Sequence, residues 1–473
     1  SYLPILLLSL LSACRPVPSD PPPAPAYETG YRGIWDGNQA RDDEYAYKYA
    51  GGLGTYPQQH IPIAVYSEEA RKTFFVYGGS EADRNSLVYA IGYFDHTTGM
   101  VSRPVRIAAK ETQDPHDNPV LSIDAKGYLW VFANAHGLAR PAFVYRSRAP
   151  YDIRFFDQVD STNFSYSQPW HLGEKGFLWL RTQYQQEYGM RHLYWLTSRD
   201  GFQWRDPQRL VAIEQGNYQI SWSDGDKVAT AFDMHPEPYG PYLEEEGYMG
   251  LNWRSNIYYL ETRDGGQSWQ TIQGDTIQPP VTDRGHISLA YNSLQDDQRV
   301  YLKDLAFDEA GRPVILFLLA NSYKPGPESG PRSWHTLAWD GQAWQRSAPI
   351  FISDHNYDHG SLYLEADGTW RIIAPGLPGP QPHATGGEMG MWVSHDRGQN
   401  WDLKPLTTGS RFNHTYARRP LHAHPDFYAL WADGHGTEPS SSRLYFTDRA
   451  GSAVWQLPAE MDSTHARPVR VRK

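Results

Sequence analysis

The chain has 473 residues, of which 14% are aromatic and only 21% charged, with 41 glycines, 36 prolines and a single cysteine. The formal net charge of −11 excludes a protein that binds nucleic acid mainly by charge, because a phosphate backbone selects a basic surface. One cysteine excludes a disulfide scaffold, and the frequent Gly, Pro, Trp and Tyr favour many short strands joined by tight turns.

The chain opens on an apolar run from Tyr2 to Leu11 that ends in small residues before a proline-rich stretch. A run this short is typical of an export signal and not of a membrane span. The string Leu11-Ser12-Ala13-Cys14 matches the bacterial lipoprotein signal, in which the cysteine is lipidated, although a plain signal peptide with an incidental cysteine is the alternative. We expect residues 1–14 to be a lipoprotein signal peptide truncated at its front, 15–27 a linker and 28–473 one catalytic domain. The predicted location is the outer membrane, cell surface or periplasm of a Gram-negative bacterium.

Short alternating strands are predicted through the rest of the chain, and no long amphipathic helix is evident. The predicted strands include Gly127–Ala133, Ala142–Arg146, Gly176–Thr182, Leu193–Thr197, Ile257–Thr262, Val314–Leu319, Trp370–Ala374 and Asp426–Trp431. The fold class is therefore all-β.

A short motif recurs between these strands, at Ser198–Trp204, Thr262–Trp269 and Ser394–Trp401. The last two fit the Asp-box spacing S/T-x-D-x-G-x-x-W, and the first is one residue shorter. In such a turn the Asp accepts hydrogen bonds from backbone amides, the Gly takes a positive φ and the Trp packs between sheets. Dividing the region from about residue 50 to about residue 457 into seven gives about 58 residues per unit. We predict a seven-bladed β-propeller of four-stranded antiparallel blades, with six or eight blades as alternatives.

Titratable side chains recur at equivalent places in successive units. His116, Tyr166 and Tyr218 open three units, and His136, Tyr184 and His235 follow the second strand of the same units. These positions share one end of each blade beside the axis, so the side chains should converge on a central mouth. Candidates from other blades are His60, Lys303, His355, His359, His414 and Arg418.

Arg181 lies in the strand that follows Tyr166, where an inward arginine is costly unless it meets an anion or a salt-bridge partner in a neighbouring blade. A cluster of His, Tyr and Arg favours eliminative cleavage of a uronic acid. That reaction needs a cation on the sugar carboxylate, a base for the C5 proton and an acid for the departing O4 oxygen. Hydrolysis would instead need paired carboxylates, for which Asp117, Asp233, Asp304 and Glu388 are the candidates.

Several long strings resemble the BNR-repeat propellers that include the ulvan lyases. They are Tyr31–Gln39, Tyr56–His60, Asp114–Pro119, Asn163–Tyr166, Gly250–Tyr259, Asp354–Ser361 and Trp431–Gly436. The resemblance covers almost all of the chain after the linker. It implies β-elimination at the linkage between sulfated rhamnose and glucuronate or iduronate in ulvan, an acidic sulfated polysaccharide.

The resemblance also implies site residues. A His pair, a Tyr and an Arg carry the reaction in that family, and they fall here on His116, His136, Tyr166 and Arg181, with Tyr184 as the alternative tyrosine. Arg181 and His136 would engage the uronate carboxylate, while Tyr166 and His116 exchange the C5 and O4 protons. The residues expected to bind substrate are Tyr184, Tyr218, His235, His60, His414 and Arg418.

No cofactor is expected for the chemistry itself. Some relatives carry a structural zinc or calcium, for which His235 is a candidate ligand, and we expect a monomer. The alternative functions are a rhamnose–glucuronate lyase acting on arabinogalactan, a sialidase-like hydrolase, and a non-catalytic glycan-binding lipoprotein.

Overall fold

The structure is a computed structural model. It describes residues 24–40, 47–54, 60–81, 86–114, 116–185, 190–236, 253–324 and 326–471. The expected signal peptide, the lipidation residue Cys14 and most of the expected linker lie outside these residues. Within the described ranges, no helix is long and apolar enough to cross a membrane.

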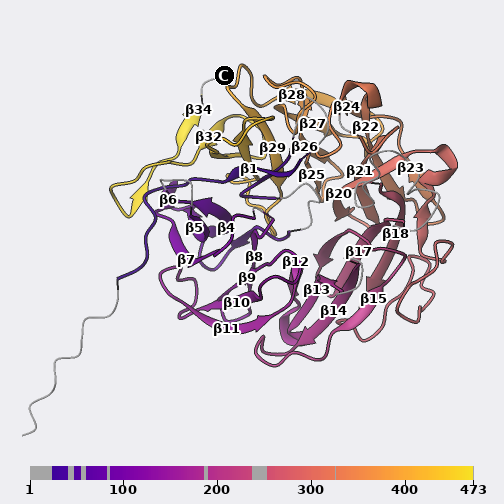
Figure 1. The fold of residues 1–473 in the computed structure, drawn as a ribbon, viewed down its shortest axis with the longest axis horizontal. Coiled ribbons are helices and arrows are strands. Elements are labelled where there is room, and N and C mark those ends of the chain that lie inside the picture. Colours follow the sequence, from indigo (N-terminus) through magenta and orange to yellow (C-terminus); the bar gives the residue numbers. More distant parts are fainter. Residues whose placement is uncertain are drawn as a thin grey trace, which may run out of the picture.

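Seven antiparallel sheets form the blades of a β-propeller, as predicted (Figure 1). The first blade consists of β3 (Ala64–Ser67), β4 (Lys72–Ser80), β5 (Leu87–Asp95) and β6 (Met100–Ser102), with β7 (Val105–Ala109) paired to β5. The second blade consists of β8 (Pro119–Ile123), β9 (Leu129–Ala133), β10 (Ala142–Ser147) and β11 (Phe156–Thr162). The third blade consists of β12 (Ser165–His171), β13 (Phe177–Tyr184), β14 (Arg191–Ser198) and β15 (Gln208–Val211). The next two consist of β16 (Gln219–Asp224), β17 (Lys227–Met234), β18 (Ser255–Thr262) and β19 (Leu289–Tyr291); and β20 (Arg299–Phe307), β21 (Pro313–Ala320), β22 (Arg332–Trp339) and β23 (Trp344–Arg346), with β24 (Phe351–Ser353) paired to β22. The last two consist of β25 (Ser361–Leu364), β26 (Trp370–Leu377), β27 (Glu388–Ser394) and β28 (Asp402–Pro405); and β29 (Asn413–Arg418), β30 (Ala429–Gly434), β31 (Leu444–Thr447) and β32 (Val454–Gln456).

The first strand of each blade is the innermost one. β8 contacts β12, β16 contacts β20, and β20 contacts β25, so the first strands of successive blades surround the axis. The strands are apolar on both faces where blades pack on each other, as in β21, whose eight residues are all buried. Alternating strand direction then puts the start of every first strand and the end of every second strand at one end of the ring.

The predicted strands are present, each with at least one end displaced by one to three residues. The strand expected from Asp426 begins at Ala429, because the Phe427 amide donates to the His424 carbonyl at 3.0 Å and closes a turn there.

The Asp-box turns join third and fourth strands, as their sequences predict. Asp264 Oδ1 accepts hydrogen bonds from the backbone amides of Gln267 at 2.9 Å and Ser268 at 3.0 Å, and Trp269 is buried. Gly266 has a φ of 86°, and a Cβ there would collide with Leu178 of the neighbouring blade. The motif therefore fixes a turn and a contact between blades.

Two short strands close the ring between the first and last blades. β33 (His465–Ala466) pairs with β6 of the first blade, and β34 (Val469–Val471) pairs with β32 of the last. Gly33 bridges Gly79 of β4 and Ser442 of the last blade. The indigo and yellow ends of the chain accordingly lie side by side in Figure 1. A separate ribbon of β1 (Trp35–Ala40) and β2 (Tyr47–Gly51) lies against the last blade through Trp35, whose ring packs edge-on to Tyr416.

Candidate active site

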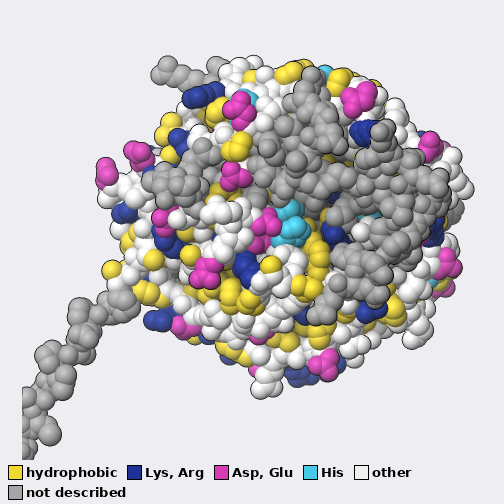
Figure 2. All heavy atoms as spheres, in the orientation of Figure 1, with side chains coloured by type: hydrophobic (Ala, Val, Ile, Leu, Met, Phe, Trp, Pro, Cys, Tyr) yellow, Lys and Arg dark blue, Asp and Glu magenta, His cyan; other side chains and the backbone are white. Residues whose placement is uncertain are grey.

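Seven of the residues singled out from the sequence form one continuous group at the end of the ring where first strands begin and second strands end. The centroids of the side-chain rings lie 3.8 Å apart for His116 and His136, 5.6 Å for His136 and Tyr184, and 4.5 Å for Tyr218 and His235. The centroid of the Tyr166 ring lies 5.8 Å from that of Tyr218 and 5.2 Å from that of His60. Figure 2 shows histidine side chains exposed near the middle of the ring, beside acidic, basic and hydrophobic ones.

Asp114 holds the two histidines of the second blade together. Nδ1 of His116 lies 2.6 Å from one carboxylate oxygen, and Nδ1 of His136 lies 2.7 Å from the other. An ionised carboxylate only accepts hydrogen bonds, so both Nδ1 atoms carry a proton, and Nε2 of each ring keeps its lone pair when that ring is neutral. The arrangement therefore supplies two imidazoles in the tautomer that a base needs.

The same contacts set the charges of the group. Burial alone would raise the pKa of the Asp114 carboxyl, but the facing imidazoles and their hydrogen bonds hold it well below its usual range. Burial and the neighbouring His136 lower the pKa of His116 to about 4, against the attraction of Asp114. His116 is therefore neutral at neutral pH. The side chain of His136 is 29% exposed and that of His116 only 4%, so His136 is the member of the pair open to a ligand.

Tyr184 and Arg191 continue the group into the third blade. They face each other across β13 and β14, and the Arg191 guanidinium lies 4.9 Å from the Tyr184 ring. Arg191 also donates a hydrogen bond from Nη1 to the Tyr218 hydroxyl at 2.9 Å. Burial raises the pKa of Tyr184 to about 12, although Arg191 lowers it. Tyr184 is thus a protonated phenol beside a cation.

Tyr166 is held in a rare backbone conformation. Its φ is 52°, in the left-handed region that tyrosine seldom adopts, and it lies where the register of β12 against β13 shifts between Ser165 and Gln168. The bulge places the ring, which is 1% exposed, between His60 and Tyr218. Strain of this kind concentrates at functional sites, and here it brings the Tyr166 side chain to the group.

His235 forms the far end of the group and is fully buried. Its Nε2 lies 3.7 Å from Asp233, and its pKa is lowered well below the usual value by burial and by the cations Arg191 and Arg254. Burial raises the pKa of Asp233 to about 7. Among the described residues, His235 belongs to no group of three potential metal ligands, so its expected role as a ligand is unsupported.

The structure places Arg181 away from this group, which corrects its predicted position. Its guanidinium lies 4.6 Å from the Trp179 ring and 6.0 Å from Phe164, between the second and third blades. Burial lowers its pKa to about 10, and its Nε and Nη1 have no hydrogen-bond partner within the described ranges. The prediction was wrong because Arg181 and Trp179 lie two positions apart in β13. Side chains alternate along a strand, so both point to the same side of β13, between the two blades.

His414 and Arg418, the other two residues expected to bind substrate, have different surroundings. His414 uses both ring nitrogens within its surroundings, accepting from Trp431 Nε1 at 3.1 Å and bonding Ser410 Oγ at 2.9 Å, so packing accounts for it. Arg418 donates from Nε to the Leu53 carbonyl at 2.9 Å and helps to lower the pKa of the buried His60.

The carboxylates considered for hydrolysis are each bound into separate contacts. Asp117 pairs with Arg140 at 2.6 Å, Asp304 accepts from the Leu362 amide at 2.8 Å, Asp233 accepts from the Tyr218 amide at 2.9 Å, and Glu388 accepts from the Ser410 amide at 2.7 Å. Each of the four is thus engaged by an arginine or by a backbone amide.

Sequence reasoning missed Asp114 and Arg191. Asp114 stood in a string that carried the resemblance, and its place two residues before His116 was the available signal. Arg191 could have been found from the hairpin that follows β13, because antiparallel pairing puts it opposite Tyr184.

No protein-family model matches the chain. An ulvan lyase of Alteromonas sp. (strain LOR) is 21% identical over 445 residues, which cover 83% of this chain and 84% of that protein. An ulvan lyase of Pseudoalteromonas sp. (strain PLSV) is 20% identical, covering 81% of this chain and 82% of that protein. The chain is a homologue of the ulvan lyases.

The solved structure of an ulvan lyase of polysaccharide lyase family PL25, bound to -[GlcA(1-4)Rha3S]-, has the same fold. It matches with a TM-score of 0.69 at 16% identity over 88% of this chain and 96% of that one. A second polysaccharide lyase matches with a TM-score of 0.59 at 9% identity, over 90% of this chain and 99% of that one. The propeller fold predicted from the resemblance to ulvan lyases is thereby confirmed.

Proposed function

We propose that this protein is an ulvan lyase that cleaves the bond between 3-sulfated rhamnose and a uronic acid by β-elimination. The observation that carries the proposal is the grouping of a carboxylate-linked His pair, a protonated tyrosine and an arginine in a homologue of ulvan lyases. These are the groups that elimination next to a carboxylate requires.

The roles follow from the charges. Arg191 is the cation that engages the uronate carboxylate, because an arginine fork matches a carboxylate and the side chain lies within the group. A neutral imidazole of the pair accepts the C5 proton at Nε2. As the C5–H and C4–O4 bonds break and the C4–C5 double bond forms, Tyr184 donates its proton to the departing O4 oxygen.

Tyr184 takes the place that the sequence favoured for Tyr166. Its ring lies against the exposed His136 and beside Arg191, whereas Tyr166 is enclosed by His60 and Tyr218. Tyr166 is then a positioning residue, whose ring packs edge-on to Tyr218.

The experiment that tests the function measures the ultraviolet absorbance of an unsaturated uronate after mixing the protein with ulvan and, separately, with arabinogalactan, heparin and alginate. A rise with ulvan alone is expected. A rise with arabinogalactan alone would support the rhamnose–glucuronate lyase instead. Reducing sugar released without absorbance would support a hydrolase, and retention on a polysaccharide column without either product would support a binding protein.

The attachment of the protein to the cell is a further part of the proposal. We infer export and lipid attachment at Cys14 from the signal-like sequence, with the propeller displayed as a monomer at the surface or in the periplasm. We also assign the three Asp boxes to BNR repeats, and the lyase chemistry to side chains without a cofactor. A Cys14→Ser variant of the exported chain should move from the membrane fraction to the soluble fraction.

A further inference from the structure

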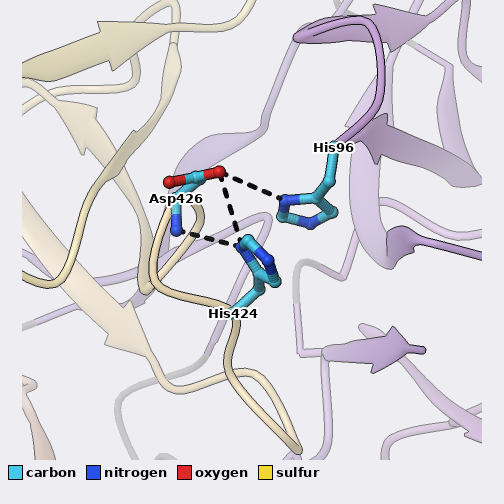
Figure 3. A group of neighbouring side chains, drawn as sticks. All are labelled: His96, His424 and Asp426. Atoms are coloured by element: carbon cyan, nitrogen blue, oxygen red, sulfur yellow. Dashed lines mark hydrogen bonds and ion pairs between the residues drawn. The ribbon is translucent and has the colours of Figure 1, made fainter.

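A second cluster of histidines and a carboxylate lies at the seam that closes the ring. His96 follows β5 of the first blade, and His424 and Asp426 lie between β29 and β30 of the last blade (Figure 3). The three side chains offer ligand atoms that all lie within 4.8 Å of one another. They follow a third strand and a first strand, so they lie at the end of the blades opposite the candidate active site.

His96 directs a buried nitrogen into the cluster. Its side chain is only 3% exposed, and its Nε2 lies 2.8 Å from the Thr73 hydroxyl. Nδ1 faces Asp426 at 4.0 Å and has no hydrogen-bond partner among the described residues. A hydroxyl can accept as well as donate, so the Thr73 contact allows a proton on Nε2, which hydrogen-bonded metal-bound histidines commonly have on the nitrogen away from the metal. The free lone pair then points at the carboxylate of the neighbouring blade.

His424 presents its Nδ1 lone pair from the other side. The Asp426 backbone amide donates to this nitrogen at 3.2 Å, so Nδ1 is unprotonated, and a metal bound there would replace this hydrogen bond. The same nitrogen lies 3.7 Å from Asp426 Oδ2. Tyr66 packs against both imidazoles, with ring centroids at 5.1 Å from His96 and 4.9 Å from His424, and so limits their movement.

The spacing of the three groups matches a metal better than a hydrogen-bonded cluster. The carboxylate oxygen lies 3.7 Å and 4.0 Å from the two imidazole nitrogens, beyond hydrogen-bond distance. Ligand atoms around a tetrahedral zinc, with bonds of about 2.0–2.1 Å, are about 3.3 Å apart. The two distances from the carboxylate oxygen would therefore have to shorten by about 0.4 Å and about 0.7 Å to close the cluster on an ion.

An ion can reach the cluster from solvent. His96 and Asp426 line a cleft of about 660 Å³, whose wall also includes Phe446 and Trp455. The Asp426 side chain is 64% exposed and the His424 side chain 26% exposed. The open side leaves room for a water molecule as a fourth ligand.

We propose that His96, His424 and Asp426 bind a divalent transition metal of the zinc type, which clamps the first blade to the last. Two imidazoles and one carboxylate suit Zn²⁺, Co²⁺ or Ni²⁺, whereas Ca²⁺ and Mg²⁺ prefer a shell of oxygens. The metal bridges two segments that are far apart in sequence, so its effect is on stability of the closed ring. The lyase chemistry at the opposite end does not use it.

The test is the zinc content of the purified protein, stripped with chelator, loaded with Zn²⁺ and passed through a desalting column. The wild type should keep one equivalent, and its unfolding midpoint should rise by about 3 °C at a hundredfold excess of Zn²⁺ over its Kd. His424→Ala and Asp426→Asn should lose both effects. Asp426→Asn changes a largely exposed side chain, so it keeps the test valid if His424→Ala fails to fold.

The matched control is His136→Ala, because Asp114, His116 and His136 form the other group of potential ligands in the described residues. This variant should keep the zinc and the shift in midpoint. Zinc lost from His136→Ala and kept by the two seam variants would overturn the proposal, as would a wild type that keeps no zinc. Metal-stripped protein should cleave its substrate at the wild-type rate below its unfolding midpoint.

Discussion

Replacing Asp114 with Asn should impair catalysis strongly while changing the shape of the site little. The carboxylate accepts a hydrogen bond from His116 on one oxygen and from His136 on the other. An amide keeps one acceptor and puts an NH₂ group against the other imidazole, which must then lose its bond or change tautomer. A charge-assisted hydrogen bond is worth about 1.5–3 kcal/mol, so kcat/KM on ulvan should fall by about 10- to 100-fold.

The assay is the initial rate of absorbance increase from unsaturated uronate, measured across pH. In the wild type, kcat/KM should fall as pH falls through about 4, where His116 takes up a proton. Loss of the Asp114 charge removes an attraction that raises the pKa of His116, so the acid limb of the variant should move to lower pH. Asp117→Asn is the matched control, because it changes a nearby buried carboxylate that pairs with Arg140 and not with the histidines. Equal rates in wild type and Asp114→Asn, with both folded, would refute the role given to the carboxylate.

Three further predictions follow from the site. Arg191→Lys should lower kcat/KM by about 100-fold, because lysine lacks the planar guanidinium fork that matches a carboxylate. Arg181→Lys should keep the rate per folded molecule within about 3-fold of the wild-type rate. A larger loss in Arg181→Lys than in Arg191→Lys would restore Arg181 to the site. Tyr184→Phe should abolish turnover but leave retention on an ulvan column, and Tyr166→Phe should keep measurable activity; an active Tyr184→Phe would contradict the assignment of the acid. Burial raises the pKa of Asp233 from 3.8 to about 7, so its contribution to stability is complete below 3.8 and is lost as pH rises through about 7. The unfolding midpoint measured by calorimetry should therefore fall between about pH 4 and about pH 7, with a smaller fall in Asp233→Asn, and equal slopes would exclude this carboxyl as the cause.

The fold could be predicted because its signals are local and repeated. Each Asp box specifies a turn by its own hydrogen bonds, as Asp264 shows, and each strand has its own apolar pattern. Equivalent positions in successive blades then identified the end of the ring that gathers His116, His136, Tyr184 and Tyr218.

The parts of the site that were missed depend on side-chain direction and on pairing between strands. Arg181 and Arg191 both lie in the third blade, and only the face of the strand and the register of the hairpin separate them. The exchange of roles that we propose between Tyr166 and Tyr184 rests on a bulge with a positive φ, which the sequence of a strand does not reveal. The seam cluster joins His96 to His424 across blades that sequence spacing alone does not bring together.

The closing strands also determine when the molecule can become a ring during folding. Tyr93 and His465, which bond through their side chains at 2.8 Å, lie 372 positions apart. The middle blades consist of neighbouring hairpins and can form first, but β6 and β32 keep open edges until residues 465–471 pair with them. We therefore expect the exported chain to pass through an open arc, whose edges chaperones or a second chain can reach, and to complete the circle in a late step with high contact order.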